Sequence, residues 1–439
     1  MNKAILRLAI PNIISNITVP LLGLVDMSIV GHLDSADYIG AIARASAIFN
    51  LIYWNFSFLR MGTSGFTAQF YGAGNRQEQA NILIRSLFIA LIGAVIIIAC
   101  QSFILKLGYL IFDTNIQIAT YVNEYFSIYI WAAPAILGMY AFNGWFVGMQ
   151  DAKTPMFIAI GINIVNIGLS LFFVYVLGMK IDGVALASVC AQYMGLFSAF
   201  TICLFKHKEL RKFINFSILK DTKAFIPLFK VNTDILIRTL ALVTVTTFFM
   251  SASSRDNTNN IMDVNALLMQ LFILFSYFMD GFAYAAEALT GKFIGARRRS
   301  ELKSLVHYLF RWGFVIVFIF TSVYVIFFEQ ILNILTDKQN IIELAIQYKY
   351  WVFIIPIAGF SAFLWDGIFI GATASRQMRN SMLVAAATFF LIYFSFYHFF
   401  TLFFVKNSNN ILWFVFILYL AMRGIAQMIM ARTILNESK

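Results

Sequence analysis

Four carboxylic acids lie inside long apolar runs, where a charge is costly and therefore usually functional. Asp26 follows Pro20 in the first such run, Asp280 and Glu287 share a later one, and Asp366 lies in another. An acid held away from water takes up protons readily, so Asp26 is a candidate proton-binding residue. Asp280 and Glu287 are nearly two helical turns apart, and with Asp366 they offer oxygen ligands to a hard cation. The alternative for these three acids is ion pairing with Arg238, Arg311 or Arg60.

Uncharged polar side chains form a second set within the apolar runs: Asn143, Asn163, Asn166, Ser188 and Gln192. Asn163 and Asn166 are three residues apart, so they share one helical face. Amides between membrane helices often hold the helices together, which is the structural alternative for each residue. The functional interpretation is a cavity that binds a substrate.

The composition requires these residues to sit in a membrane. Of 439 residues, 61% are hydrophobic and 12% charged, whereas soluble domains are typically about 25% charged. The three cysteines lie in apolar runs and indicate neither a disulfide framework nor a metal cluster. Walker, His-Glu-x-x-His and Gly-x-Ser-x-Gly motifs are absent, so we expect no enzyme, no cofactor and no direct use of ATP.

A helix needs about 20 apolar residues to cross a bilayer, and the sequence predicts an all-α polytopic membrane protein with twelve transmembrane helices. The predicted spans are 10–31, 41–70, 83–110, 123–148, 155–178, 182–205, 225–251, 263–292, 305–333, 345–371, 382–405 and 411–433.

Basic residues predict the orientation. With the amino terminus inside, 21 Lys and Arg residues fall in cytoplasmic segments and 6 on the other side. The positive-inside rule therefore places both termini in the cytoplasm of a multi-pass cell (inner) membrane protein. Topology explains the net charge of +11, and we expect no nucleic-acid partner.

An internal repeat divides the chain. At an offset of 223 residues, Gly144 falls on Gly367 and Gly148 on Gly371. We predict two pseudo-symmetric six-helix lobes, 1–205 and 224–439, joined by a cytoplasmic loop at 206–223. An even number of spans gives the two lobes the same orientation, as in transporters with parallel repeats.

The chain resembles the multidrug and toxic compound extrusion (MATE) family, and within it the DinF branch. The most specific stretches are 25–33 (VDMSIVGHL), 58–69, 280–287, 366–373 and 378–382. The resemblance covers essentially the whole chain. It implies twelve helices in two lobes and export of drug-like compounds against an inward flow of protons or sodium.

The resemblance also implies roles for individual residues. In similar prokaryotic transporters an acid on the first helix is the protonation site, which corresponds to Asp26. Polar residues on helices four to six correspond to Asn143, Asn166, Ser170 and Ser188. Ser170 departs from the pattern, because relatives carry an acid there. Sodium-coupled relatives use acids of the carboxy-terminal lobe.

The sequence favours a monomeric, proton-coupled antiporter that exports amphipathic, cationic compounds by alternating access, with membrane lipid around it. One alternative is the same exporter coupled to sodium. Another is a flippase for a lipid-linked saccharide, which would need several cationic residues facing its cavity. A membrane enzyme is the least favoured class.

Overall fold

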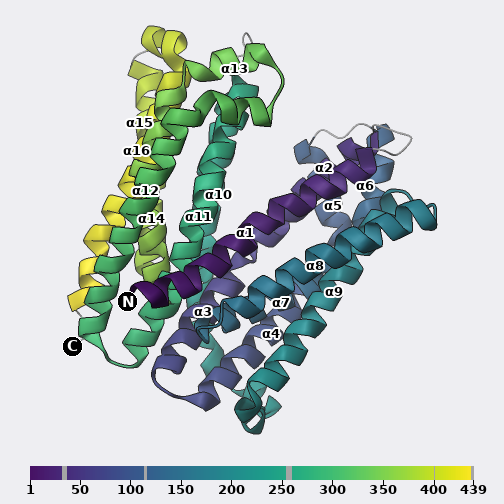
Figure 1. Ribbon diagram of the computed structural model, residues 1–439, viewed down its shortest axis with the longest axis vertical. Helices are drawn as coiled ribbons and strands as arrows, with labels where there is room; N and C mark the ends of the chain where they lie inside the picture. The colour runs from purple at the N-terminus through teal and green to yellow at the C-terminus, as the bar shows by residue number, and fades with distance from the viewer. Residues whose placement is uncertain (32–36, 113–115, 254–259, 400, 437–439) are drawn as a thin grey trace. The chain divides into compact units, whose positions relative to one another are not determined.

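The computed structural model describes residues 1–31, 37–112, 116–253, 260–399 and 401–436, and its elements are shown in Figure 1. Within these ranges, the side chains of 19–22, 24, 26, 27, 112, 116, 117, 401–407 and 433–436 are not described. Every regular element in the described ranges is helical. The chain divides into an amino-terminal unit, residues 10–232, and a carboxy-terminal unit, residues 1–9 and 233–439.

Nine α-helices precede the segment that joins the two halves of the sequence. A 3₁₀ turn, Ile130–Ala132, links two of them, and α8 continues into a π-helical turn, Phe172–Val176. The bounds are α1 (Asn2–Gly31), α2 (Asp37–Asn55), α3 (Ser57–Gly72), α4 (Arg76–Ala99), α5 (Gln101–Phe112), α6 (Ile116–Tyr129), α7 (Ala133–Gly148), α8 (Lys153–Leu171) and α9 (Ile181–Lys206). In this unit α7 packs against α3, α4 and α9, and α8 lies beside α9.

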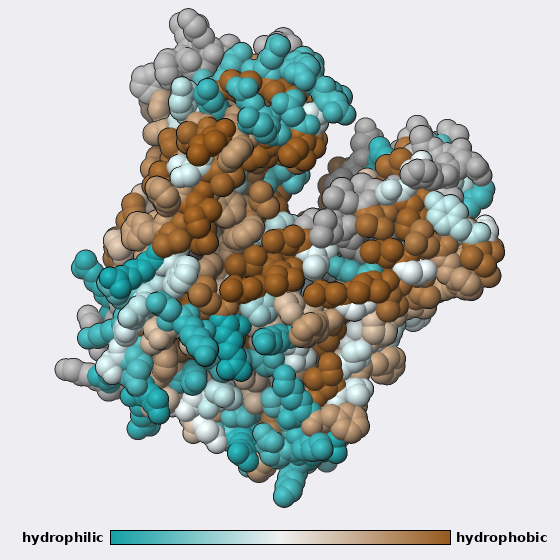
Figure 2. All heavy atoms as spheres, in the orientation of Figure 1, coloured by the Kyte–Doolittle hydropathy of each residue, from teal (hydrophilic) through white to brown (hydrophobic). Residues whose placement is uncertain are grey.

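Seven helices follow in the second half. Their bounds are α10 (Ile226–Ser253), α11 (Ile261–Gly295), α12 (Arg299–Leu335), α13 (Gln339–Ile346), α14 (Lys349–Gly371), α15 (Ser375–Phe399) and α16 (Thr401–Asn436). Within this unit α14 packs against α11, α12 and α16. Figure 2 shows apolar residues covering the middle of these helices and polar residues at the end near α13, as expected for a segment that crosses a bilayer.

Ten helical stretches in the described part are long and apolar enough to cross a membrane. The other two predicted spans fall on α1 and on the α2–α3 pair. Predicted span 41–70 breaks at Phe56, and predicted span 83–110 breaks at Cys100, whose φ of −90° and ψ of 7° end α4. Neither break has a proline or glycine at the interruption, so the sequence carries no signal for it.

The internal repeat reappears as two matching helix crossings. A Cβ atom on Gly144 of α7 would lie 2.2 Å from the backbone oxygen of Arg60 in α3. A Cβ on Gly367 of α14 would lie 2.2 Å from the backbone oxygen of Ala283 in α11. Gly144 and Gly367 are 223 residues apart, and so are Arg60 and Ala283. Only glycine permits such close backbone approach, so the repeat encodes an equivalent close helix crossing in each unit.

The helix ends that follow these crossings also match. After α7, Gln150 has a φ of 65°, and after α14 Thr373 has a φ of 52°. After α3 and α11, the left-handed residues are Gly74 and Arg297, with φ of 69° and 56°. All four helices end with the paired backbone hydrogen bonds of a Schellman motif. The predicted offset of 223 therefore describes the backbone as well as the sequence.

The segment 206–223, predicted as a linking loop, belongs to the amino-terminal unit. It forms short 3₁₀ segments at Lys208–Phe213 and Phe216–Lys220 that pack against α4. Leu210 is buried, and Phe225 just beyond makes an edge contact with Phe88 of α4. The compact carboxy-terminal unit resumes at Thr233, within α10, and also includes residues 1–9.

Candidate functional site

Buried polar side chains from α8 and α9 meet in the amino-terminal unit. Asn166 of α8 is 1% exposed, and its Nδ2 donates a hydrogen bond of 2.7 Å to Oγ of Ser188 on α9. Ser170 lies one turn further along α8 and is fully buried. Gln192 lies one turn after Ser188 and is half-buried. The structure thus brings Asn166 and Ser188 together in a hydrogen bond between helices, which is a common arrangement of polar side chains in membrane proteins.

Several polar atoms of this unit are buried without a hydrogen bond. Among the described residues, Oδ1 of Asn143, Oδ1 of Asn166 and Oγ of Ser170 have no partner. An unsatisfied buried polar atom costs about 1–3 kcal/mol, and native proteins keep few of them. Three such atoms lie on α7 and α8, where they can accept hydrogen bonds from a ligand or a protonated group.

Asn163 has a different role from Asn166. Its Nδ2 donates a 2.9 Å hydrogen bond to the backbone oxygen of Thr18 in α1, so it joins α8 to the first helix. The Oγ1 atom of Thr18 in turn donates to the backbone oxygen of Ser15. The hydrogen bond from Asn163 therefore holds α8 against the helix that carries Asp26. Helix α1 runs unbroken through that position, but the side chain of Asp26 lies outside the described part of the structure.

Asp366 lies at the centre of a charged cluster in the carboxy-terminal unit. Its Oδ2 accepts hydrogen bonds from the guanidinium groups of Arg238 on α10 and Arg423 on α16. Its Oδ1 accepts one from Nε2 of Gln427. Asp366, Arg238 and Arg423 are 6%, 8% and 2% exposed. The ion-pairing alternative is therefore confirmed for Asp366 and for one predicted partner, Arg238.

Asp280 and Glu287 do not join Asp366 in a metal-binding cluster. In the described part of the chain, no three His, Cys, Asp or Glu side chains lie together in a way that could hold a metal ion. Glu287 is fully buried and Asp280 half-buried. The three acids therefore do not form one metal-binding group, and both oxygens of Asp366 are engaged with Arg238, Arg423 and Gln427. A cation-binding role for Asp280 and Glu287 stays a prediction.

Sequence reasoning missed Arg423 and Gln427, although both lie within the predicted span 411–433. Arg423 could have been singled out from the sequence, because a charged residue inside a membrane span is costly and is kept only for a reason. A second ion pair that sequence reasoning missed joins Asp234 of α10 to Arg379. Oδ1 of Asp234 accepts a hydrogen bond from Arg379 at 2.5 Å, and Oδ2 accepts one from the Ser375 hydroxyl at 2.8 Å. This pair ties α10 to the start of α15.

An ion pair at the end of α9 keeps the Asp151 carboxylate in its ionised form. Oδ2 of Asp151 accepts hydrogen bonds from Lys206 at 2.6 Å and from the Thr154 hydroxyl at 2.6 Å. Burial raises the pKa of Asp151, but the hydrogen bonds and the Lys206 charge outweigh it, so its pKa lies below the usual range. Asp151 therefore stays ionised and fastens the α7–α8 connection to α9.

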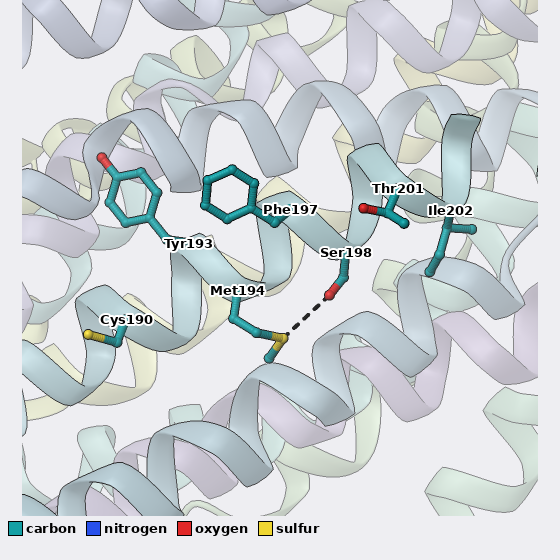
Figure 3. A pocket seen from close by; sticks show the side chains of 7 residues that line it. All are labelled: Cys190, Tyr193, Met194, Phe197, Ser198, Thr201 and Ile202. Atoms are coloured by element: carbon teal, nitrogen blue, oxygen red, sulfur yellow. Dashed lines mark hydrogen bonds between the residues drawn. The ribbon is translucent and has the colours of Figure 1, made fainter. Parts of the chain in front are cut away.

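An open hollow along α9 is the less suitable place for a charged substrate (Figure 3). Its lining residues, spaced along one face of α9, are mostly apolar. The Ser198 hydroxyl is already engaged with Sδ of Met194 at 3.4 Å, and Phe197 is 65% exposed. A face of this kind on a membrane helix is suited to contact with lipid chains.

The fold and the buried polar sets define a helical membrane transporter built from two repeated units. Comparisons with known proteins agree. The family model MatE matches residues 11–172 and 236–397. The chain is 37% identical to DNA damage-inducible protein F of Escherichia coli (strain K12), over 97% of this chain and 91% of that protein.

Solved structures show the same fold. A MATE crystal structure in the bent conformation matches with a TM-score of 0.86 and 20% identity, covering 100% of this chain and 96% of that one. An outward-facing multidrug resistance MATE family transporter matches with a TM-score of 0.84 and 21% identity, with the same coverage. The chain belongs to the MATE family of multidrug and toxin efflux transporters. The predicted resemblance and the all-helical two-lobe fold are confirmed.

Proposed function

We propose that this chain is a proton-coupled exporter of amphipathic, cationic compounds, with Asp26 as the residue that binds the proton. The observation that carries the proposal is the set of unsatisfied buried polar atoms on α7 and α8: Asn143, Asn166 and Ser170. They lie in the same unit as Asp26, and Asn163 links α8 to the Asp26 helix.

A single carboxylate makes the exchange of proton for substrate simple in charge terms. Ionised Asp26 balances a cationic substrate, and protonated Asp26 needs no counter-ion. Neutral amide and hydroxyl groups such as Asn143 and Ser170 hydrogen-bond to either form without adding charge. Exchange across the membrane then requires that the two access states bind the proton with different affinity.

Sodium coupling through the carboxy-terminal unit is less favoured by the contacts of Asp366. A sodium ion is a hard cation that binds several oxygen ligands. Both oxygens of Asp366 already accept hydrogen bonds from Arg238, Arg423 and Gln427. The same pairing engages Arg238, one of the arginines considered for binding the pyrophosphate group of a flippase substrate.

We further place both termini and the 206–223 segment on the cytoplasmic side of the inner membrane, since the basic residues are concentrated there.

Transport of a fluorescent lipophilic cation into inverted vesicles tests the proposal, with either a pH gradient or a sodium gradient imposed. The pH gradient should drive uptake of the cation by wild type, and Asp26→Asn should lose that uptake. Asp263→Asn, the same chemical change at an exposed position of α11, is the matched control and should transport normally. Sodium-driven uptake that survives in Asp26→Asn would move the coupling site to the other unit. Uptake under neither gradient would favour the flippase.

A further inference from the structure

A partly open cavity lies in the amino-terminal unit, and none of the polar residues of the proposed transport site lines it. Its volume is about 350 Å³, within the usual range of ligand pockets. Residues of α4 form one wall, residues of α7 and α9 form others, and residues of the 206–223 segment complete the lining.

The walls of this cavity are apolar. Leu87 and Phe88 of α4, Phe142 of α7 and Phe200 of α9 are among the lining residues. Such walls exclude a polar ligand but accommodate a hydrocarbon chain, whose burial contributes about 0.8 kcal/mol per methylene.

Arg211 is an exposed residue that lines the cavity and makes two contacts with the end of α9. Its Nε donates a 2.7 Å hydrogen bond to the backbone oxygen of Leu204, and its guanidinium lies 5.4 Å from the centre of the Phe205 ring. That is the only hydrogen bond of Arg211 within the described part of the chain, so its two terminal amino groups remain for a ligand. A guanidinium with two such groups matches the geometry of a phosphate.

His207 contributes a second polar atom to the lining. The centre of its ring lies 4.9 Å from the centre of the Trp145 ring, in an edge-to-face arrangement. Its Nε2 is buried with no hydrogen-bond partner among the described residues. Burial lowers the pKa of His207 and the Asp151 and Glu209 charges only partly oppose this, so the ring is neutral near pH 7. A neutral imidazole suits the ester region of a lipid.

The covering segment has the composition of a membrane-surface element. Residues 206–223 carry six basic and two acidic side chains. Beside the exposed lysines, Ile214 is 43% and Phe216 69% exposed. Basic residues next to exposed apolar ones are typical of segments lying at the surface of an anionic leaflet.

We propose that this cavity binds one acyl chain of an anionic phospholipid of the cytoplasmic leaflet, with the lipid phosphate held by Arg211. An anionic phospholipid fits because its charge complements the basic 206–223 segment and its acyl chain matches the apolar walls. A bound lipid joins the segment to α4 and α9.

Native mass spectrometry of the full-length protein tests this directly, with phosphatidylglycerol, phosphatidylcholine and oleate offered separately. Wild type should retain phosphatidylglycerol, and Arg211→Gln should retain about tenfold less, since a charge-assisted contact is lost. Lys212→Gln removes the same charge from a residue that does not line the cavity, and should match wild type. Ala80→Trp, which fills the cavity from α4, should also lose the lipid.

A second measurement keeps the proposal testable if a variant folds poorly. Phosphatidylglycerol with a photoreactive acyl chain should crosslink wild type within α4 and residues 200–219. Crosslinks elsewhere would overturn the assignment. Equal losses in Arg211→Gln and Lys212→Gln would show diffuse surface attraction instead of a site. Equal retention of phosphatidylcholine, or preferential retention of oleate, would also contradict it.

Discussion

Replacing Asp366 by asparagine should destabilise the protein strongly, because the change leaves the Arg238 and Arg423 guanidinium groups buried without their shared counter-ion. Removing one partner of a buried ion pair typically costs about 3–5 kcal/mol. The cluster is less than one-tenth exposed, so solvent screening offers little relief. For a unit of this size the loss corresponds to a fall of roughly 10 °C in the unfolding temperature.

Thermal unfolding of the purified protein in detergent measures this effect. Asp366→Asn should unfold well below wild type, whereas Asp263→Asn, at an exposed position, should not. Adding Arg423→Gln to Asp366→Asn should recover part of the loss, because one of the two uncompensated charges is then gone. Added sodium should not stabilise wild type through Asp366. The reasoning is refuted if Asp366→Asn unfolds like wild type yet abolishes sodium-dependent stabilisation or transport.

Three further predictions concern the amino-terminal unit. Gly144→Ala should lower the unfolding temperature, because its Cβ would meet a backbone oxygen at 2.2 Å, while Gly161→Ala, with open space around it in the described structure, should raise it slightly. The contribution of the Asp151–Lys206 contact should be present at neutral pH and disappear as the pH falls through the lowered pKa of Asp151, so Asp151→Asn should flatten the acid side of the stability profile relative to wild type. Ser170→Asp should add a second titrating group and broaden the pH dependence of efflux, whereas Ser170→Ala should leave that dependence unchanged.

Much of the fold follows from the sequence, because membrane-spanning helices and repeats leave strong one-dimensional patterns. The 223-residue offset predicted from Gly144 and Gly367 corresponds to two equivalent glycine contacts in the structure. The interruptions at Phe56 and Cys100 could not be predicted, since packing rather than a helix-breaking residue places them.

The charged cluster of the carboxy-terminal unit was only partly predictable. Asp366 and Arg238 stood out as charges inside apolar runs, but sequence spacing cannot show which helices meet. The third member, Arg423, comes from α16, and its contact with Asp366 depends on the packing of α14 against α16. The pairing that decides the role of Asp366 is therefore a property of the tertiary structure.

Proton release on substrate binding tests the central proposal most directly, since a proton and a cationic substrate compete for one carboxylate. Purified protein in weakly buffered detergent solution is mixed with a lipophilic cation at several starting pH values, and the pH change is recorded. The account predicts release of up to one proton per bound cation in wild type and none in Asp26→Asn. Binding without proton release in wild type, together with an affinity that depends on sodium, would contradict it.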